Sequence, residues 1–127
     1  MTVLPDSVTP LRYQRRIARR YPVQMALTWS PIERRHWRRR PRTCRATTAN
    51  VSLTGIGFES VPLPDIDRGS AVTITIGETR CTAAVRFSQP GTRLGSRYYG
   101  IEITDSEMMN TLQRAIDDYR GVSAAGR

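Results

Sequence analysis

The sequence predicts a mainly β protein, with six short antiparallel strands that close into a small barrel and one α-helix at the C-terminus. Three observations support this fold class. Apolar and polar residues alternate with a period of two in several short segments. Turns rich in glycine and proline separate these segments at hairpin spacing, and a helical pattern follows the last of them. A barrel also avoids exposed strand edges, because its sheet closes on itself.

Length and charge limit the classes of function. With 127 residues, the chain has room for one domain with a modest core. The net charge is +9, and every basic residue is an arginine. Residues 12–45 hold twelve arginines and one acid (12 − 1 = +11), whereas the rest of the chain holds eight arginines and ten acids (8 − 10 = −2). Such a positive field attracts nucleotides, nucleic acid or anionic membrane surfaces and disfavours enzymes that act on neutral substrates.

Neither export nor metal binding is indicated. The sequence contains no run of about 18 apolar residues, and residues 1–11 lack the features of a signal peptide. We therefore expect a soluble cytoplasmic protein. Cys44 and Cys81 have no metal-ligand spacing and are expected to be packed free thiols. The single histidine, His36, lies in a charged loop, so we expect it to have no metal or catalytic role.

The N-terminal segments lead from a tail to the first strand. Residues 1–11 contain two prolines and no periodic pattern, which predicts a loose tail. Residues 12–20 have too few apolar side chains for a stable amphipathic helix and are expected to form a mobile arm. This arm holds the closely spaced arginines Arg15, Arg16, Arg19 and Arg20. After Pro22, apolar residues alternate from Val23 to Trp29, which predicts the first strand.

A second basic segment, Arg34–Arg42, precedes the second strand. We expect it to be a solvated surface loop. The alternative is a contact surface for nucleic acid, a partner or anionic lipid, which Trp37 favours because an aromatic ring among arginines can stack on a base or enter a membrane interface. Cys44–Ser52 is then the predicted second strand, Leu53–Gly55 a turn, and Ile56–Ser60 the third strand.

Three further strands complete the predicted barrel. Ala71–Ile76 and Arg80–Phe87 alternate, and Gly77–Glu78 between them fits a two-residue hairpin with glycine first. In the second of these strands, the apolar face is expected to contain Cys81, Ala83, Val85 and Phe87. Ser88–Arg93 is a predicted turn, and Ser96–Thr104 is the sixth strand. Its apolar face is expected to contain Tyr99, Ile101 and Ile103.

The last element is a helix with start and stop signals. Thr104 and Glu107 have the spacing of a capping box with Thr104 as the N-cap, and Gly121 supplies the stop. The residues predicted to line its apolar face are Met108, Leu112, Ile116 and Tyr119.

Two motifs in this order resemble the PilZ domain family. Arg16-Ile17-Ala18-Arg19-Arg20 has R-x-x-x-R spacing ahead of a strand, and Asn50-Val51-Ser52-Leu53-Thr54-Gly55 is a [D/N]-x-S-x-x-G motif after the second strand. Gly100-Ile101-Glu102-Ile103 and the terminal helix follow. The resemblance divides the chain into a tail (1–11), a PilZ domain (12–120) and a second tail (121–127). Within the domain it implies an arginine arm (12–22), a barrel (23–104) and a helix (105–120).

The resemblance implies a six-stranded PilZ-type split barrel that binds cyclic di-GMP, a bacterial second messenger, and relays the signal to a protein effector. It implies a receptor rather than an enzyme, with no metal and no cofactor besides this ligand. Ser52 is not expected to act as a catalytic nucleophile, because no candidate general base lies at a recognisable spacing from it in the sequence. The expected ligand-binding residues are Arg15, Arg16, Arg19, Arg20, Asn50, Ser52 and Gly55.

The arginines suit this ligand. Cyclic di-GMP carries phosphates and guanines, and a guanidinium fork can hold a phosphate or the O6/N7 edge of guanine. By the resemblance, one of Arg16 and Arg20 reads the guanine edge and the other meets phosphate. Arg15 and Arg19 have the same spacing and remain an alternative register, or serve as auxiliary donors.

The second motif supplies smaller polar groups. Asn50 can accept from the N1/N2 edge of guanine, and Ser52 offers a hydroxyl to phosphate or to a guanine amine. Gly55 lets the backbone approach the ligand closely, and Gly57 is expected at a position where a Cβ would crowd another backbone or the ligand.

The predicted mechanism is ligand-induced ordering, in which phosphates neutralise the mutually repelling arginines of the arm and fix it over the barrel near Ser52. The alternative is a basic small-barrel protein that binds nucleic acid through both arginine clusters. A salt-dependent affinity for oligonucleotides would indicate this second function.

Overall fold

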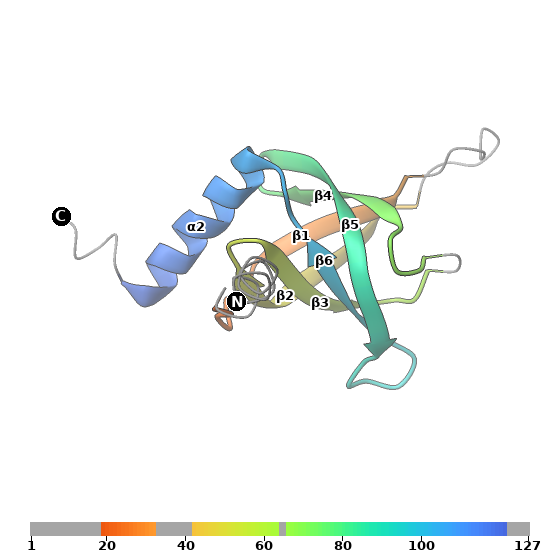
Figure 1. Ribbon diagram of the computed structural model, residues 1–127. Helices are drawn as coiled ribbons and strands as arrows, with labels where there is room; N and C mark the ends of the chain where they lie inside the picture. The colour runs from red at the N-terminus through yellow and green to blue at the C-terminus, as the bar shows by residue number, and fades with distance from the viewer. Residues whose placement is uncertain (1–18, 33–41, 64–65, 122–127) are drawn as a thin grey trace, which may run out of the picture.

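The computed structural model describes residues 19–32, 42–63 and 66–121. Six antiparallel strands form a closed barrel in the order β1–β2–β3–β6–β5–β4, and a helix follows the last strand (Figure 1). This arrangement confirms the predicted fold class. The elements are β1 (Ala26–Pro31), β2 (Cys44–Ser52), β3 (Gly55–Ser60), β4 (Ala71–Ile76), β5 (Thr79–Pro90), β6 (Arg97–Glu102) and α2 (Ser106–Arg120).

The barrel is filled by one continuous hydrophobic core. Its centre is an aromatic cluster in which the ring of Trp29 lies 5.3 Å from Phe58 and 4.8 Å from Tyr99, measured between centroids. The polar atoms of the cluster keep partners, because Trp29 Nε1 donates to Ser60 Oγ (3.0 Å) and Tyr99 OH accepts from Leu63 N (3.2 Å). Buried Trp and Tyr side chains therefore pack here without an unsatisfied polar atom.

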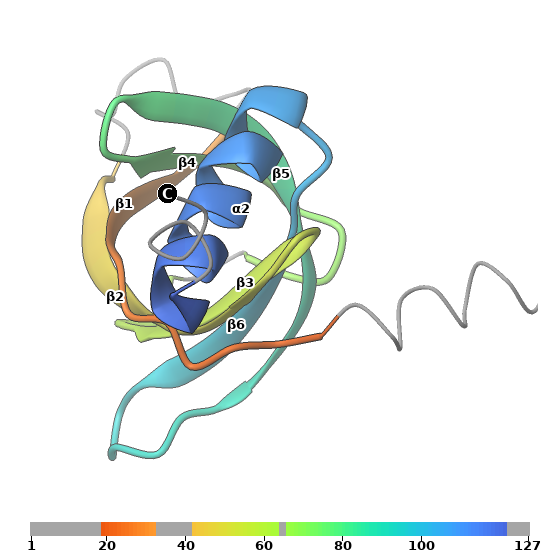
Figure 2. The same ribbon diagram turned by 90° about the vertical axis from the view of Figure 1, so that its left-hand side faces the viewer.

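Helix α2 lies across one end of the barrel (Figure 2). Met108, Leu112 and Ile116 are buried, as the helical spacing predicts. The prediction for Tyr119 is wrong, since this side chain is 53% exposed and its ring lies 6.1 Å from that of Tyr21 instead of entering the core. No helix in the described ranges is long and apolar enough to span a membrane.

The helix begins one residue later than the capping-box spacing predicts. Asp105 is the N-cap, and its side chain accepts a hydrogen bond from Met108 N (2.9 Å). Thr104 is therefore not the cap. Both residue types cap helices well, so composition alone could not separate them. The predicted stop is confirmed, because Gly121 has φ 77° and its N–H bonds to Asp117 O and Asp118 O.

The first strand also differs from its prediction. It runs from Ala26 to Pro31, whereas alternation placed it from Val23 to Trp29. The Thr48 hydroxyl explains the difference, because it donates to Val23 O (2.7 Å) and accepts from Met25 N (2.8 Å). A side chain of β2 thus takes the backbone groups that a strand partner would use.

The β5–β6 hairpin is longer than predicted. Strand β5 continues to Pro90 and β6 begins at Arg97, so the connecting loop is 91–96 and not Ser88–Arg93. The β4–β5 hairpin agrees with its prediction, since Ile76 pairs with Thr79 and Gly77 has φ 60°.

Both cysteines are free thiols, as predicted. Cys81 is buried in β5, and burial, together with the negative charge of Asp105, raises its pKa to about 11. Cys44 is half-buried at the start of β2.

Candidate ligand-binding site

The end of the arginine arm lies against β2. Tyr21 forms an isolated antiparallel bridge with Val51, in which Tyr21 N donates to Val51 O (2.8 Å) and Val51 N donates to Tyr21 O (2.9 Å). This bridge places Arg20 beside Asn50, thirty residues further along the chain, and Arg20 Nη1 donates to Asn50 Oδ1 (2.8 Å). The structure therefore brings one residue of each sequence motif into direct contact.

Asn50 connects the arm to β6. Its Nδ2 donates to the hydroxyl of Tyr98 (2.8 Å), while its Oδ1 accepts from Arg20. An amide oxygen has two lone pairs, so Oδ1 keeps one acceptor position for a further donor. The sequence did not point to Tyr98, because only the register of β3 and β6 places it near the second motif.

Ser52 and Gly55 form the base of the β2–β3 turn, where they are paired across the hairpin. The Ser52 side chain is only 3% exposed, and its Oγ donates to Gly55 O (3.4 Å) and accepts from Thr54 N (3.3 Å). Hydrogen bonds of this length are weak, so the hydroxyl can be redirected at small cost. A Cβ on Gly55 would lie 3.0 Å from Ile101 O, a tight contact with backbone that favours glycine at this position.

A small hollow of about 200 Å³ lies beside this turn. It joins three predicted site residues to residues of β5 and β6 that sequence reasoning missed. Its lining is Arg20, Ser52, Thr54, Gly55, Arg86, Phe87, Gly100, Ile101 and Glu102. Arg86 Nη1 lies 3.4 Å from Glu102 Oε1, so the second cation of the hollow is partly balanced by a carboxylate.

Phe87, which lines the hollow, belongs to an aromatic pair. Phe87 and Tyr98 are stacked, with ring centroids 6.0 Å apart and planes at 26°. Gly57 and Gly100 lie opposite each other on β3 and β6 and make room for the pair, because a Cβ on Gly57 would collide with Tyr98 and one on Gly100 with Phe87. At Gly57 the close neighbour is thus a side chain, and not the backbone or ligand that we predicted.

Phe87 faces outward, which corrects the prediction that it shares the buried face of Val85. The β5–β6 register shifts between Val85 and Phe87, and this irregularity turns Phe87 over Gly100. The ring is 39% exposed. A strict period of two could not reveal it, because the irregularity at Arg86 changes which residues face the core.

Several predicted residues lie elsewhere. Arg19 is described and exposed. Arg15 and Arg16 lie outside the described residues, as do His36, Trp37 and most of the Arg34–Arg42 loop. Within the described ranges, no group of three or more His, Cys, Asp and Glu side chains could hold a metal ion.

Comparison with known proteins decides the family. The sequence model of the PilZ domain matches residues 13–118. The chain belongs to the PilZ domain family. PilZ domains are receptors that bind cyclic di-GMP and act on protein effectors; they are not enzymes.

A solved structure supports the same fold. The Bacillus subtilis inhibitor of motility (MotI/DgrA) superposes on this PilZ domain with a TM-score of 0.55 at 18% sequence identity. The match covers 80% of this chain and 50% of that one, so this chain spans about half the length of MotI/DgrA. No curated protein sequence matches the chain.

Proposed function

We propose that this PilZ domain is a cyclic di-GMP receptor whose site lies between the arginine arm and the β2–β3 turn. The observation that carries the proposal is the 2.8 Å contact between Arg20 and Asn50, which joins the two motifs beside a hollow. A ligand phosphate can take the place of Asn50 on the guanidinium, because an anion forms an ion pair with two parallel hydrogen bonds where the uncharged amide oxygen of Asn50 accepts only one. The guanine N1/N2 edge can then donate to the freed Oδ1 of Asn50.

The hollow fits part of the ligand. Pockets that enclose a drug-sized molecule have volumes of roughly 300–1,000 Å³, and this hollow has about 200 Å³. We infer that one guanine enters it and stacks on the exposed ring of Phe87. The rest of the ligand then needs a cover from another part of the chain.

The arginine arm is the proposed cover. Tyr21 is already held on β2 by two backbone hydrogen bonds, so ordering by the ligand concerns the residues before Arg19. Arg16, four positions before Arg20, adds a second guanidinium in the preferred register, and Arg15 and Arg19 add auxiliary donors. Closure by residues 12–18 would place several positive charges around the two phosphates.

Tyr21 also provides a route by which ligand binding can be transmitted to a protein effector. Its ring contacts Tyr119, and the guanidinium of Arg120 lies 5.8 Å from its centroid. Tyr21 follows Arg20 directly, so a movement of Arg20 toward a ligand shifts a ring that packs on the end of α2. We propose that a protein effector recognises this end of the helix.

Calorimetric titration with cyclic di-GMP tests the binding site. Arg20→Ala is expected to weaken binding at least about tenfold, because a hydrogen bond to a charged group contributes roughly 1.5–3 kcal/mol. Arg114→Ala is the matched control, since Arg114 is an exposed arginine of α2 and its loss changes the net charge equally. Its affinity should stay within about twofold of the unmodified protein. Equal losses in both variants would indicate unspecific charge attraction and contradict the proposed site.

Hydrogen exchange tests the arm separately. Amides of residues 12–18 should exchange more slowly with saturating cyclic di-GMP, whereas those of the buried strand β4 should not change. Unchanged exchange in the arm, with binding intact, would refute ordering of the arm and leave the receptor function standing.

A further inference from the structure

A second and larger cleft lies where β2 and β3 separate. The register of these strands runs from Ser52 and Gly55 to Thr48 and Phe58. Beyond that pair, within the described residues, Cys44–Thr47 pairs only with β1 and Glu59–Ser60 pairs only with β6. Each strand therefore presents one unpaired edge to the space between them.

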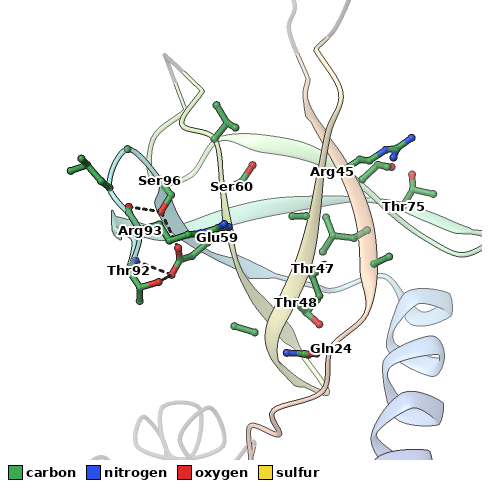
Figure 3. A pocket seen from close by; sticks show the side chains of 18 of the residues that line it. Gln24, Arg45, Thr47, Thr48, Glu59, Ser60, Thr75, Thr92, Arg93 and Ser96 are labelled. Atoms are coloured by element: carbon green, nitrogen blue, oxygen red, sulfur yellow. Dashed lines mark hydrogen bonds between the residues drawn. The ribbon is translucent and has the colours of Figure 1, made fainter.

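This space is part of a cleft of about 1090 Å³ whose lining also includes residues of β1 and β4. Figure 3 shows residues of β2, among them Arg45 and Thr47, on one side, with Glu59, Ser60 and the 92–96 loop on the other. Pockets for small molecules have volumes of roughly 300–1,000 Å³, so the cleft has room for a segment of polypeptide. It does not include Arg20, Ser52 or Phe87, and is thus separate from the proposed ligand site.

The backbone of β2 offers hydrogen-bonding groups to the cleft. Thr48 N donates to Met25 O (2.9 Å), on the side away from β3. Successive N–H groups of a strand point to opposite sides, so the N–H of Thr47 and that of Arg45 both point away from β1, toward the side of β3. The N–H of Thr47 points into the cleft, and that of Arg45, two residues earlier, does the same.

The charged and the exposed apolar side chains of the cleft determine which kind of ligand it can bind. Arg45 on β2 and Arg93 on the loop line the cleft, while the oxygens of Glu59 accept from Thr92 N (2.9 Å), Thr92 Oγ1 (2.7 Å) and Ser96 Oγ (2.9 Å). The carboxylate is thus directed into the loop that it holds. Val61 and Leu94 also line the cleft with exposed side chains, and Leu94 is fully exposed.

We propose that this cleft binds an extended segment of a partner protein, with alternating acidic and aliphatic residues, as an added strand on the free edge of β2. Strand addition gives affinity through main-chain hydrogen bonds and specificity through alternate side chains. Acidic residues of the segment pair with Arg45 and Arg93, and aliphatic ones contact Val61 and Leu94. The hydrogen bonds of Glu59 hold the loop in position before binding, which lowers the entropic cost of association.

Two synthetic peptides test the proposal by amide NMR titration. The first alternates Asp and Val; the second has the same sequence but carries N-methyl groups on alternate residues, which removes donors and keeps every side chain. The first peptide is expected to shift the resonances of Arg45 and Thr47 and to slow the exchange of their amides. The N-methylated peptide should leave both unchanged at the same concentration.

Two variants distinguish binding of the peptide in the cleft from unspecific attraction between the acidic peptide and the basic chain. Arg45→Glu is expected to weaken binding of the Asp-Val peptide by roughly tenfold or more, since like charges in an interface are strongly unfavourable. Arg114→Glu, which makes the same charge change on α2, should bind like the unmodified chain.

Four results would overturn the proposal. The first is equal binding of the N-methylated peptide, and the second is no binding of the parent peptide at millimolar concentration. The third is that the peptide shifts only residues near Arg20. The fourth is that a single-stranded oligonucleotide, and not the peptide, shifts Arg45 and Thr47.

Discussion

Thr48→Val removes a single hydroxyl that fixes the path of the chain from the arginine arm into β1. The Thr48 side chain is 1% exposed, and its Oγ1 lies 2.7 Å from Val23 O and 2.8 Å from Met25 N. Valine has nearly the same shape, so the substitution removes both hydrogen bonds and leaves a carbonyl and an N–H without their partner.

The expected loss of stability is about 2 kcal/mol. Each of the two backbone groups that lose this partner costs about 1–3 kcal/mol when it stays buried, and the lower half of this range applies because Met25 is only half-buried. The added methyl group recovers about 0.8 kcal/mol through burial. Because domains of this kind are stable by only roughly 5–15 kcal/mol, the effect is easily measured by urea denaturation. The same variant should bind cyclic di-GMP more weakly, since Val23 is close to Arg20 in the chain.

Thr47→Val is the matched control. Thr47 is the exposed neighbour on the same strand, so the same chemical change should alter the free energy of unfolding by no more than about 0.5 kcal/mol. If Thr48→Val lost no more stability than Thr47→Val, the hydroxyl would not be what holds this segment.

Three further predictions concern the hollow, the long hairpin and the thiols. Gly100→Ala is expected to displace the ring of Phe87, lowering stability by about 1–3 kcal/mol and weakening cyclic di-GMP binding; unchanged affinity in calorimetry would exclude Phe87 from the site. Hydrogen bonds lower the pKa of Glu59 to about 2, and the bond from the Thr92 side chain contributes most to this shift. The stability that the ionised carboxylate contributes is therefore present above pH 4.5 and lost as the pH falls through 2. A midpoint above 4 in an NMR titration of this carboxyl group would refute the prediction. Buried Cys81, with its pKa raised to about 11, should resist a thiol reagent at pH 8, while half-buried Cys44 reacts. Mass spectrometry of the labelled peptides checks this, and faster labelling of Cys81 than of Cys44 would contradict it.

Much of the fold could be predicted because alternation reports burial directly. The predicted limits of β4, which alternation indicated, and of β2, which its content of Thr, Ala and Val indicated, coincide with those observed. The start of β1 could not be predicted, since it depends on a hydrogen bond from Thr48, more than twenty residues away. The helix start shifted for a local reason, because Thr104 and Asp105 are both good caps and the apolar pattern does not choose between neighbours.

The candidate site could be predicted only where its residues belong to the two motifs. The spacing of Arg20 and Asn50 in the sequence does not reveal their contact, and the family resemblance supplied only the expectation that both motifs bind the same ligand. Phe87 and Tyr98 were missed because their stacking depends on an irregularity in β5 and on two glycines that face each other across strands. Such features arise from strand register, which a single sequence does not specify at that precision.

An amide NMR titration of the isotope-labelled chain with cyclic di-GMP tests the central claim most directly. We predict saturable shifts at Arg20, Asn50, Gly55 and Phe87, with no change at Thr75 on the far side of the barrel. Shifts confined to other residues, or none at millimolar ligand, would contradict a receptor site between the arginine arm and the β2–β3 turn.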